Sequence, residues 1–323
     1  MAELIVPQAP QEEPQFVSTD ASEGLVGSVS PGRLALRRFL HHKMAMVSII
    51  VLLFVTVVCV LAPVLAPYAQ NERITKLDNP LTHTPSPAVP FGTDSIGRDM
   101  LSRVMWGGRV SLFIGIAVAL SSTLIGTLMG SVSALRGGLI DDVLMRVTDV
   151  FLALPILVFL PVIAQLPNRQ PWARSVIGNK GSVRLMITLL SIVAWMPTAR
   201  IVRGVMLSLK EKEFIEAARA MGAKTSRVIV GHLIPNAIGP IMVTASFTVA
   251  AAIGSEATLS FFGFGVDPQH ASWGNLLTDS KTAIGAGYWW LVLYPVVALL
   301  ITVLTINFVG DGLRDAFDPK QGK

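Results

Sequence analysis

The stretch MAMVSIIVLLFVTVVCVLAPVLAPY, from Met44 to Tyr68, contains no charged residue. A helix rises about 1.5 Å per residue, so roughly 20 residues are enough to cross the apolar core of a bilayer, which is about 30 Å thick. One charged residue at the centre of a bilayer costs on the order of 2.5–3.5 kcal/mol on insertion scales. An uncharged run of this length therefore predicts a helix that spans a membrane.

Five more apolar runs follow along the chain. They extend over Val110–Leu135, Val143–Leu166, Leu185–Leu209, Ala237–Leu259 and Tyr288–Val309. The last run opens with two tryptophans, a residue type that gathers at membrane interfaces. The predicted fold class is therefore an all-α polytopic membrane protein with about six transmembrane helices. Prolines inside the runs predict kinks at Pro155, Pro161, Pro197 and Pro295.

The composition also argues against a soluble protein. Of 323 residues, 52% are hydrophobic and 15% are charged, whereas a soluble domain carries about 25% charged residues. The single cysteine, Cys59, and five scattered histidines offer no disulfide framework and no metal-ligand spacing. The formal charge of +5 comes without a compact basic patch of the kind that binds nucleic acid. We therefore expect contact with membrane lipid, no metal site and no nucleic acid.

Composition divides the chain into five segments. They are a disordered cytoplasmic tail at 1–32, an N-terminal transmembrane helix at 33–68, an extracytoplasmic loop at 69–109, a five-helix core at 110–310 that includes a charged loop at 210–236, and a cytoplasmic tail at 311–323. The first segment is rich in Gln, Glu, Pro, Ser and Gly, and cannot bury enough apolar surface to fold. Placing both termini in the cytoplasm puts more Lys and Arg on that side, as the positive-inside rule requires.

The loop at 210–236, here called the coupling loop, reads KEKEFIEAARAMGAKTSRVIVGHLIPN. Lys212 and Glu216 lie at i,i+4, which predicts a short amphipathic helix up to Gly222. Gly222 can end that helix by taking the left-handed conformation. A second short helix is expected from about Ser226, stopping before Pro235.

The coupling loop resembles the EAA loop of the membrane subunits of ABC importers, which reads EAA, three residues, Gly, nine residues, I-x-L-P. The family positions occupied here are Glu216, Ala217, Ala218, Gly222 and Pro235, while His232 and Ile234 depart from the pattern. The resemblance implies that the loop forms coupling helices in a groove of an ATPase subunit. It further implies a polar contact by the glutamate, close approach at the two alanines and a bend at the glycine. Without the resemblance, this segment reads as a solvated, charged helix.

Two further segments resemble the second membrane subunit of the dipeptide/oligopeptide permease family. They are FGTDSIGRDMLSRVMWGGRVSL at Phe91–Leu112, with the motif GTDxxGRDxxSR, and SEATLSFFGFGVDPQHASWGNL at Ser255–Leu276; the closing stretch from Asn307 agrees as well. The resemblance covers about residues 33 to 320. It implies a permease subunit of an ATP-driven importer in a prokaryotic plasma (inner) membrane. It implies a path for peptides, a second homologous permease, two ABC ATPase subunits that bind ATP and Mg, and an extracytoplasmic substrate-binding protein.

Single residues in these segments leave alternatives open. A structural cap or a direct substrate contact fits the alternating charges Asp94, Arg98, Asp99 and Arg103, in which Asp99 and Arg103 are spaced for an i,i+4 pair. A re-entrant outer element or ordinary packing fits Phe261, Phe262 and Phe264. An intramembrane acid such as Glu256 contacts the ammonium end of a peptide, pairs with a partner subunit or caps the following turn. In the third run, Asp142, Arg146 and Asp149 are spaced to neutralise one another.

Absent motifs limit the function. The chain has no GxxxxGK[ST] loop, since Gly178–Ser182 lacks the spacing, and no nucleophile with its base, so it is not expected to be an enzyme. Energy must then come from another chain. Alternatives are the same machinery importing nickel chelates, glutathione or sugars, an ion-driven secondary transporter, and a non-transporting scaffold coupled to an ATPase. The polar loop at 167–184 reads as either a docking element or an insertion.

Overall fold

The computed structural model describes residues 31–75, 81–278 and 280–318, and 75% of these residues are helical. Within these residues the β-type pairings are isolated bridges, such as the one between Thr93 and Asp99. The helices are α1 (Pro31–His41), α2 (Lys43–Val60), α3 (Ala62–Leu65), α4 (Met100–Arg136), α5 (Gly138–Ala153), α6 (Ile156–Ala164), α7 (Leu166–Arg169), α8 (Pro171–Ile177), α9 (Val183–Lys210), α10 (Glu213–Ala220), α11 (Thr225–Val228), the π-helix η1 (Ile229–Leu233), α12 (Ile234–Phe261), α13 (Trp273–Leu276), α14 (Ser280–Ala283) and α15 (Trp290–Phe317). The predicted disordered tail lies outside the described residues up to position 30.

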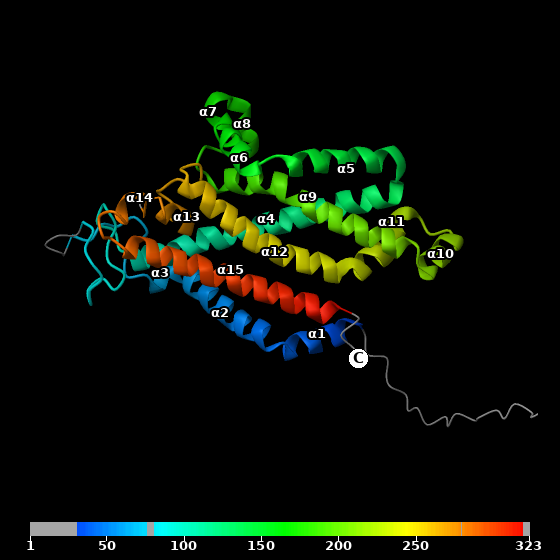
Figure 1. Cartoon of the computed structure of the whole chain (residues 1–323), viewed down its shortest axis with the longest axis horizontal. Helices are drawn as coiled ribbons and strands as arrows, with labels where there is room; N and C mark the ends of the chain where they lie inside the picture. The colour runs from blue at the N-terminus through cyan, green and yellow to red at the C-terminus, as the bar shows by residue number, and fades with distance from the viewer. Residues whose placement is uncertain (1–30, 76–80, 279, 319–323) are drawn as a thin grey trace, which may run out of the picture.

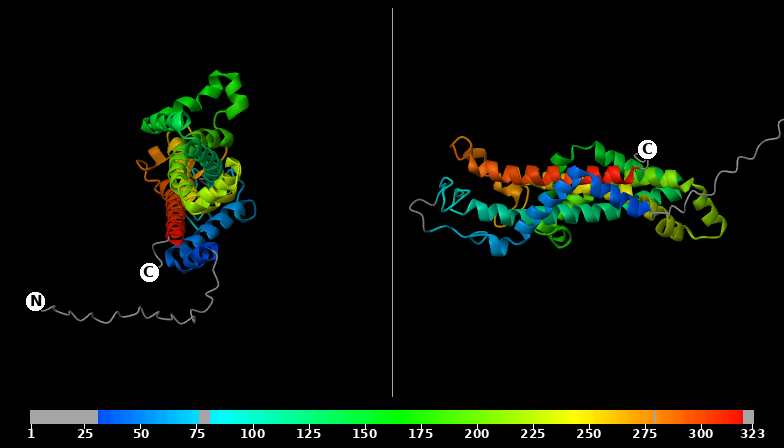
Figure 2. Two further views of the ribbon diagram at one scale, coloured as in Figure 1. Left: turned by 90° about the vertical axis from the view of Figure 1, so that its right-hand side faces the viewer. Right: turned by 90° about the horizontal axis from the view of Figure 1, so that it is seen from below.

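The long helices lie side by side and form one elongated bundle (Figures 1 and 2). Among the described residues, five helical stretches are long and apolar enough to cross a membrane, namely α2, α4, α9, η1 with α12, and α15. A sixth is present if α5 and α6 count as one bent span. The coupling loop lies at one end of the bundle, here called the α10 end, while α13 and α14 lie at the other, the α13 end (Figure 1).

Glycines on α4 let other spanning helices approach its backbone closely, as small residues do in membrane helices. A Cβ at Gly126 would lie 2.6 Å from the Cβ of Thr198 in α9, and one at Gly115 would lie 2.7 Å from a side-chain carbon of Ile253 in α12. At Gly130 the added atom would meet the carbonyl oxygen of Ala199. Helix α4 is thus in direct contact with both α9 and α12.

Several helices extend beyond the predicted spans because polar caps, rather than the edge of the apolar run, set their ends. Helix α4 begins at Met100, ten residues before the predicted run, since the carboxylate of Asp99 caps it by accepting from Ser102 N at 2.7 Å. Helix α15 continues to Phe317. The predicted helix at 33–68 is interrupted at His42, whose ring accepts from Ala45 N at 3.1 Å.

The third predicted span, 143–166, is sharply bent, and the bend lies at Pro155, where a kink was predicted. The axes of Gly138–Ala153 and Val158–Ala164 differ by 97°. The break lies at Leu154–Pro155, where Leu154 is extended with ψ 140°. Proline disfavours helical geometry in the residue before it, which explains the break. The prolines at 161, 197 and 295 instead lie inside continuous helices α6, α9 and α15.

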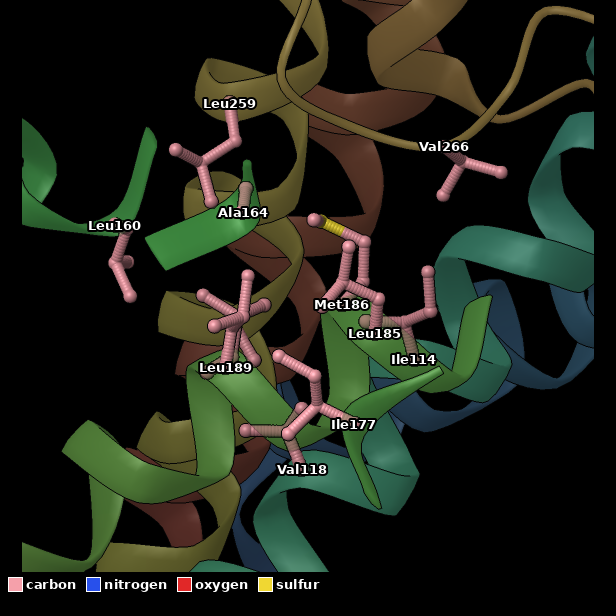
Figure 3. Packing of buried hydrophobic residues seen from close by; sticks show 12 residues of the cluster. Ile114, Val118, Leu160, Ala164, Ile177, Leu185, Met186, Leu189, Leu259 and Val266 are labelled. Carbon is pink, nitrogen blue, oxygen red and sulfur yellow. The ribbon is translucent and has the colours of Figure 1, made fainter. Parts of the chain in front are cut away.

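The two largest of four apolar cores among the described residues lie toward opposite ends of the bundle. Figure 3 shows the larger one, toward the α13 end, where Ile114 and Val118 of α4 meet Leu185 and Leu189 of α9 and Leu259 of α12. The second core, toward the α10 end, consists of Ala134, Val202, Met206, Ile215, Val228, Leu233, Ala237 and Ile241. Three members of this second core, Ile215, Val228 and Leu233, come from the coupling loop, so the loop is packed against the spanning helices.

Candidate coupling loop and the α13 end

Helix α10 presents one face to its own chain and another to solvent. Ile215 and Ala218 are buried, at 0% and 5% exposed, while Glu216 and Ala217 are exposed. The buried small side chain of Ala218 therefore lets α10 lie close to its own bundle. The exposed pair Glu216 and Ala217 is available to another protein. Sequence reasoning missed Met221, which is 83% exposed at the tip of the loop beside these residues.

The turn after α10 has the left-handed conformation predicted for Gly222, with φ +81°. The N–H of Ala223 donates to the carbonyl oxygen of Ala218 at 3.1 Å, which is the hydrogen bond of a helix C-cap with glycine at this place. A Cβ at Gly222 would meet nothing within 4 Å. The requirement for glycine is therefore one of backbone conformation and not of space.

The second half of the coupling loop does not stop before Pro235, as the sequence predicted. It runs through α11 and the wide π turn η1 directly into α12, and Pro235 lies in the first turn of α12. Inside a helical stretch proline donates no hydrogen bond and crowds the preceding turn, and here that preceding turn is the wide π turn η1. The loop and the fifth span are thus one continuous helical stretch, Ile229–Phe261.

Ion pairs near the α10 end join α5 to α9. The carboxylate of Asp141 accepts from Nε and Nη2 of Arg203 at 2.6 and 2.5 Å, and Asp149 pairs with Arg200. The predicted mutual neutralisation of Asp142, Arg146 and Asp149 within α5 is therefore wrong. The acids of α5 pair with arginines of the neighbouring helix α9 and not with an arginine of their own helix.

At the α13 end, the predicted charged motif forms a cap, but with different pairs. Asp94 accepts from Arg98 Nε at 2.6 Å and lies 3.6 Å from Nη1 of Arg103. The predicted Asp99–Arg103 pair is not formed, because Asp99 is used as the N-cap of α4. Trp290 of α15 donates from Nε1 to the carbonyl oxygen of Thr93 at 3.1 Å and so fixes the motif to the last span.

The segment after α12, residues 262–278, turns back into the bundle and is here called the re-entrant loop. Its residues 271–276 are all buried, and α13 packs against α4, α12 and α15. Its residues 267–270, here called the crest, are exposed. Phe262 is exposed at the start of the loop and packs edge-to-face on Phe261, whereas Phe264 is half-buried. A path-lining role for these aromatic residues stays a prediction.

Glu256 lies at the α13 end of α12 and is 0% exposed. Its carboxylate accepts hydrogen bonds from Ser111 at 3.2 Å, Ser260 at 2.7 Å and Ser272 at 2.8 Å. These serines come from α4, α12 and the re-entrant loop. In this arrangement the carboxylate faces neighbouring serines of its own chain, which favours the predicted capping role over contact with a substrate.

A groove of about 740 Å³ lies between α9, α12 and α15. Its walls are mostly apolar, with Pro197 and Phe247 among them, while Arg314 lies at its α10 end. None of the residues predicted to line a path borders this groove. No group of three metal-ligating side chains occurs among the described residues.

Family profiles match two parts of the chain. The profile described as binding-protein-dependent transport system inner membrane component matches residues 122–323. The N-terminal TM domain of oligopeptide transport permease C matches residues 30–83. In fold, the chain resembles one from the inward-facing MetNI methionine ABC transporter, with a TM-score of 0.55 at 22% identity over 68% of this chain and 98% of that one.

Relatives of known name are similar along most of their length. The oligopeptide transport system permease protein OppC of Bacillus subtilis (strain 168) is 38% identical over 305 residues, 94% of either chain. The dipeptide transport system permease protein DppC of the same organism is 37% identical over 91% of this chain and 87% of its own. OppC of Escherichia coli (strain K12) is 39% identical over 88% of this chain and 90% of its own.

The candidate spans, the family profile and the relatives together define a multi-pass membrane protein of the ABC transporter permease class. The chain belongs to the family of binding-protein-dependent transport system inner membrane components. Its relatives are transport permeases and not enzymes.

Proposed function

We propose that this chain is the permease subunit of an ATP-driven importer that forms the path for dipeptides or oligopeptides across a prokaryotic plasma membrane. The similarity to oligopeptide and dipeptide permeases over most of the chain carries the substrate class. The coupling loop supports the ATP-driven mechanism, because its tip is exposed for contact with another protein while its base packs against the spanning helices. Nickel chelates, glutathione or sugars on the same machinery are the second candidate, since a separate binding protein selects the cargo.

Partners supply what this chain lacks. The sequence has no phosphate-binding loop, so two ATPase subunits bind ATP and Mg and seat the coupling loops in their grooves. A second, homologous permease completes the path, and an extracytoplasmic binding protein delivers the peptide. In this arrangement Glu216 makes a polar contact to the ATPase, Ala217 lets the surfaces approach and Met221 fills an apolar depression.

This function fixes the orientation of the bundle. The coupling loop must face the compartment that holds ATP, so the α10 end and both termini are cytoplasmic and the α13 end is extracytoplasmic. The charges support this placement, since α1 carries Arg33, Arg37 and Arg38 at the α10 end and no acid. The cap around Asp94 and the crest of the re-entrant loop then face the binding protein.

The test uses the complete importer in proteoliposomes with a labelled dipeptide. Glu216→Lys places a cation where the docking surface needs an acid, so ATPase subunits are lost on purification and uptake stops while the chain still inserts. Asp311→Lys reverses an exposed acid of α15 at the same end of the bundle but outside the coupling loop, and is the matched control. Normal uptake and ATPase retention in Glu216→Lys refute the docking role. Hydrolysis that peptide-loaded binding protein does not stimulate points to a scaffold instead.

A further inference from the structure

Two serines carry hydrogen bonds from the backbone of the re-entrant loop to Glu256. The N–H of Trp273 donates to Ser111 Oγ at 3.1 Å, and that hydroxyl donates to Glu256 Oε2 at 3.2 Å. The N–H of Asn275 donates to Ser272 Oγ at 3.1 Å, and that hydroxyl donates to Oε1 at 2.8 Å. A hydroxyl has one proton, so a serine that accepts a backbone N–H points its own proton to the carboxylate.

A third series of hydrogen bonds, also from a backbone N–H to Glu256, runs through Ser260. The N–H of Val266 lies 3.4 Å from Ser260 Oγ, which donates to Glu256 Oε1 at 2.7 Å. An ionised carboxylate only accepts, and therefore satisfies three donors at once. A glutamine of the same shape would turn an NH₂ donor toward at least one hydroxyl that is itself a donor. The three chains thus demand an acceptor at this position and not merely a side chain of this size.

The part of the loop above this cluster contacts two other segments of the chain. The N–H of Asp267 donates to the carbonyl oxygen of Gly181, just before α9, at 2.8 Å. The carbonyl oxygen of Gln269 accepts from Gln70 Nε2 at 3.2 Å and from Asn71 Nδ2 at 2.8 Å. The loop is therefore bonded to two other segments, one just before α9 and one between α3 and α4, and these bonds are made by the exposed crest.

We propose that Glu256 is a positioning residue, which fixes the crest over α4 and α12 so that the binding protein meets a preformed surface. The proposal rests on the proposed function, because it takes the α13 end to be the docking side. A surface ordered before contact binds more tightly, since its conformational entropy is not lost on association. The acid acts through the loop and touches neither peptide nor partner.

The first measurement is hydrogen–deuterium exchange of the 262–278 backbone in the assembled importer in lipid nanodiscs. Glu256→Gln removes one acceptor, so at least one serine hydrogen bond is not made. The backbone amides of 262–278 then exchange about ten- to a hundredfold faster, while the exchange of α15 is unchanged. Ser111→Ala removes only the hydrogen-bond path from Trp273 to Glu256 and gives a smaller increase in exchange. This variant tests the positioning role if Glu256→Gln fails to assemble. Ser122→Ala is the control, because this buried α4 hydroxyl donates only to Ala119 of its own helix.

The second measurement is ATP hydrolysis as a function of the concentration of peptide-loaded binding protein. In Glu256→Gln we expect the half-saturating concentration to rise about tenfold or more with little change in the saturated rate, which a general loss of folded importer does not produce. Unchanged exchange and half-saturation in Glu256→Gln and Ser111→Ala overturn the positioning role. If the parent importer shows no stimulation at all, the proposed function fails, and the exchange result still reports on the loop.

Discussion

Arg203 in α9 donates two parallel hydrogen bonds to Asp141 in α5, from Nε to Oδ1 at 2.6 Å and from Nη2 to Oδ2 at 2.5 Å. Ser133 of α4 also donates to this carboxylate. Three consecutive spanning elements therefore meet at one acid beside the base of the coupling loop. A bidentate pair of this kind fixes geometry as well as charge.

Loss of this pair is expected to loosen the α10 end. Arg203→Met should lower the free energy of unfolding by about 1–2 kcal/mol, since the pair is partly exposed and water screens it. Arg200→Met, one turn earlier in α9, breaks the more exposed pair with Asp149 and should cost less than about 1 kcal/mol. Thermal unfolding of the purified variants in detergent measures both. Equal losses would contradict the greater weight given to Asp141.

The left-handed turn at Gly222 predicts a conformational cost for any side chain. Gly222→Ala should destabilise the turn by about 1–2 kcal/mol and reduce uptake, because alanine resists a φ of +81°. Gly231→Ala is the matched control in the same loop, since its Cβ also meets nothing within 4 Å but its φ is not positive. Labelled-peptide uptake at equal membrane content compares the two. Equal uptake by both variants would show that the bend is not needed.

The exposed tip of the coupling loop predicts an apolar anchor. Met221→Ser should weaken binding of the ATPase subunit about tenfold or more, the usual effect of losing a buried apolar side chain at the centre of an interface. Leu139→Ser is the control, because Leu139 is 79% exposed at the same end of the bundle but lies outside the loop. Titration of ATPase subunits onto the permease pair in nanodiscs gives the dissociation constants. A stronger effect at Leu139 would move the docking surface to α5.

The buried ring of Trp290 is expected to hold the charged motif around Asp94 to the last span. Trp290→Phe removes the hydrogen bond to the Thr93 carbonyl and part of a fully buried ring, so unfolding should become easier by about 1–3 kcal/mol. Trp289→Phe changes a neighbouring ring that is 53% exposed and should have little effect. Limited proteolysis of the 81–99 segment, with thermal unfolding, distinguishes them. Indistinguishable cleavage would mean that other contacts hold the cap.

Long-range apolar content made most of the fold predictable. A run such as Met44–Tyr68 has one stable arrangement in lipid, and five of the six predicted spans correspond to continuous spanning helices. The ends of helices were less predictable, because caps such as Asp99 and breaks such as Leu154 depend on one residue. The coupling loop was found from spacing, and its left-handed glycine is confirmed, but its continuity with α12 needed a π turn that has no sequence pattern.

Contacts between helices could not be predicted from the i,i+3 and i,i+4 spacing of charged residues, because that spacing identifies neighbours on one helix only. Asp149 was assigned a partner within α5, whereas Arg200 lies 51 residues away in sequence. Likewise, Ser111 is 145 residues from Glu256. Only folding brings such groups together, so the sequence could point to Glu256 as a buried acid but not to the serines around it.

The unbroken helical stretch from Ile229 to Phe261 has a mechanical consequence. Its 33 residues form a rod about 50 Å long, with the base of the coupling loop at one tip and Glu256 near the other. A tilt of about 5° applied at the coupling-loop tip would move the far tip by roughly 4 Å, because the stretch is that long. Under the proposed function, one continuous helical stretch then carries motion from the coupling loop to the end that holds Glu256, without a relay of separate small rearrangements.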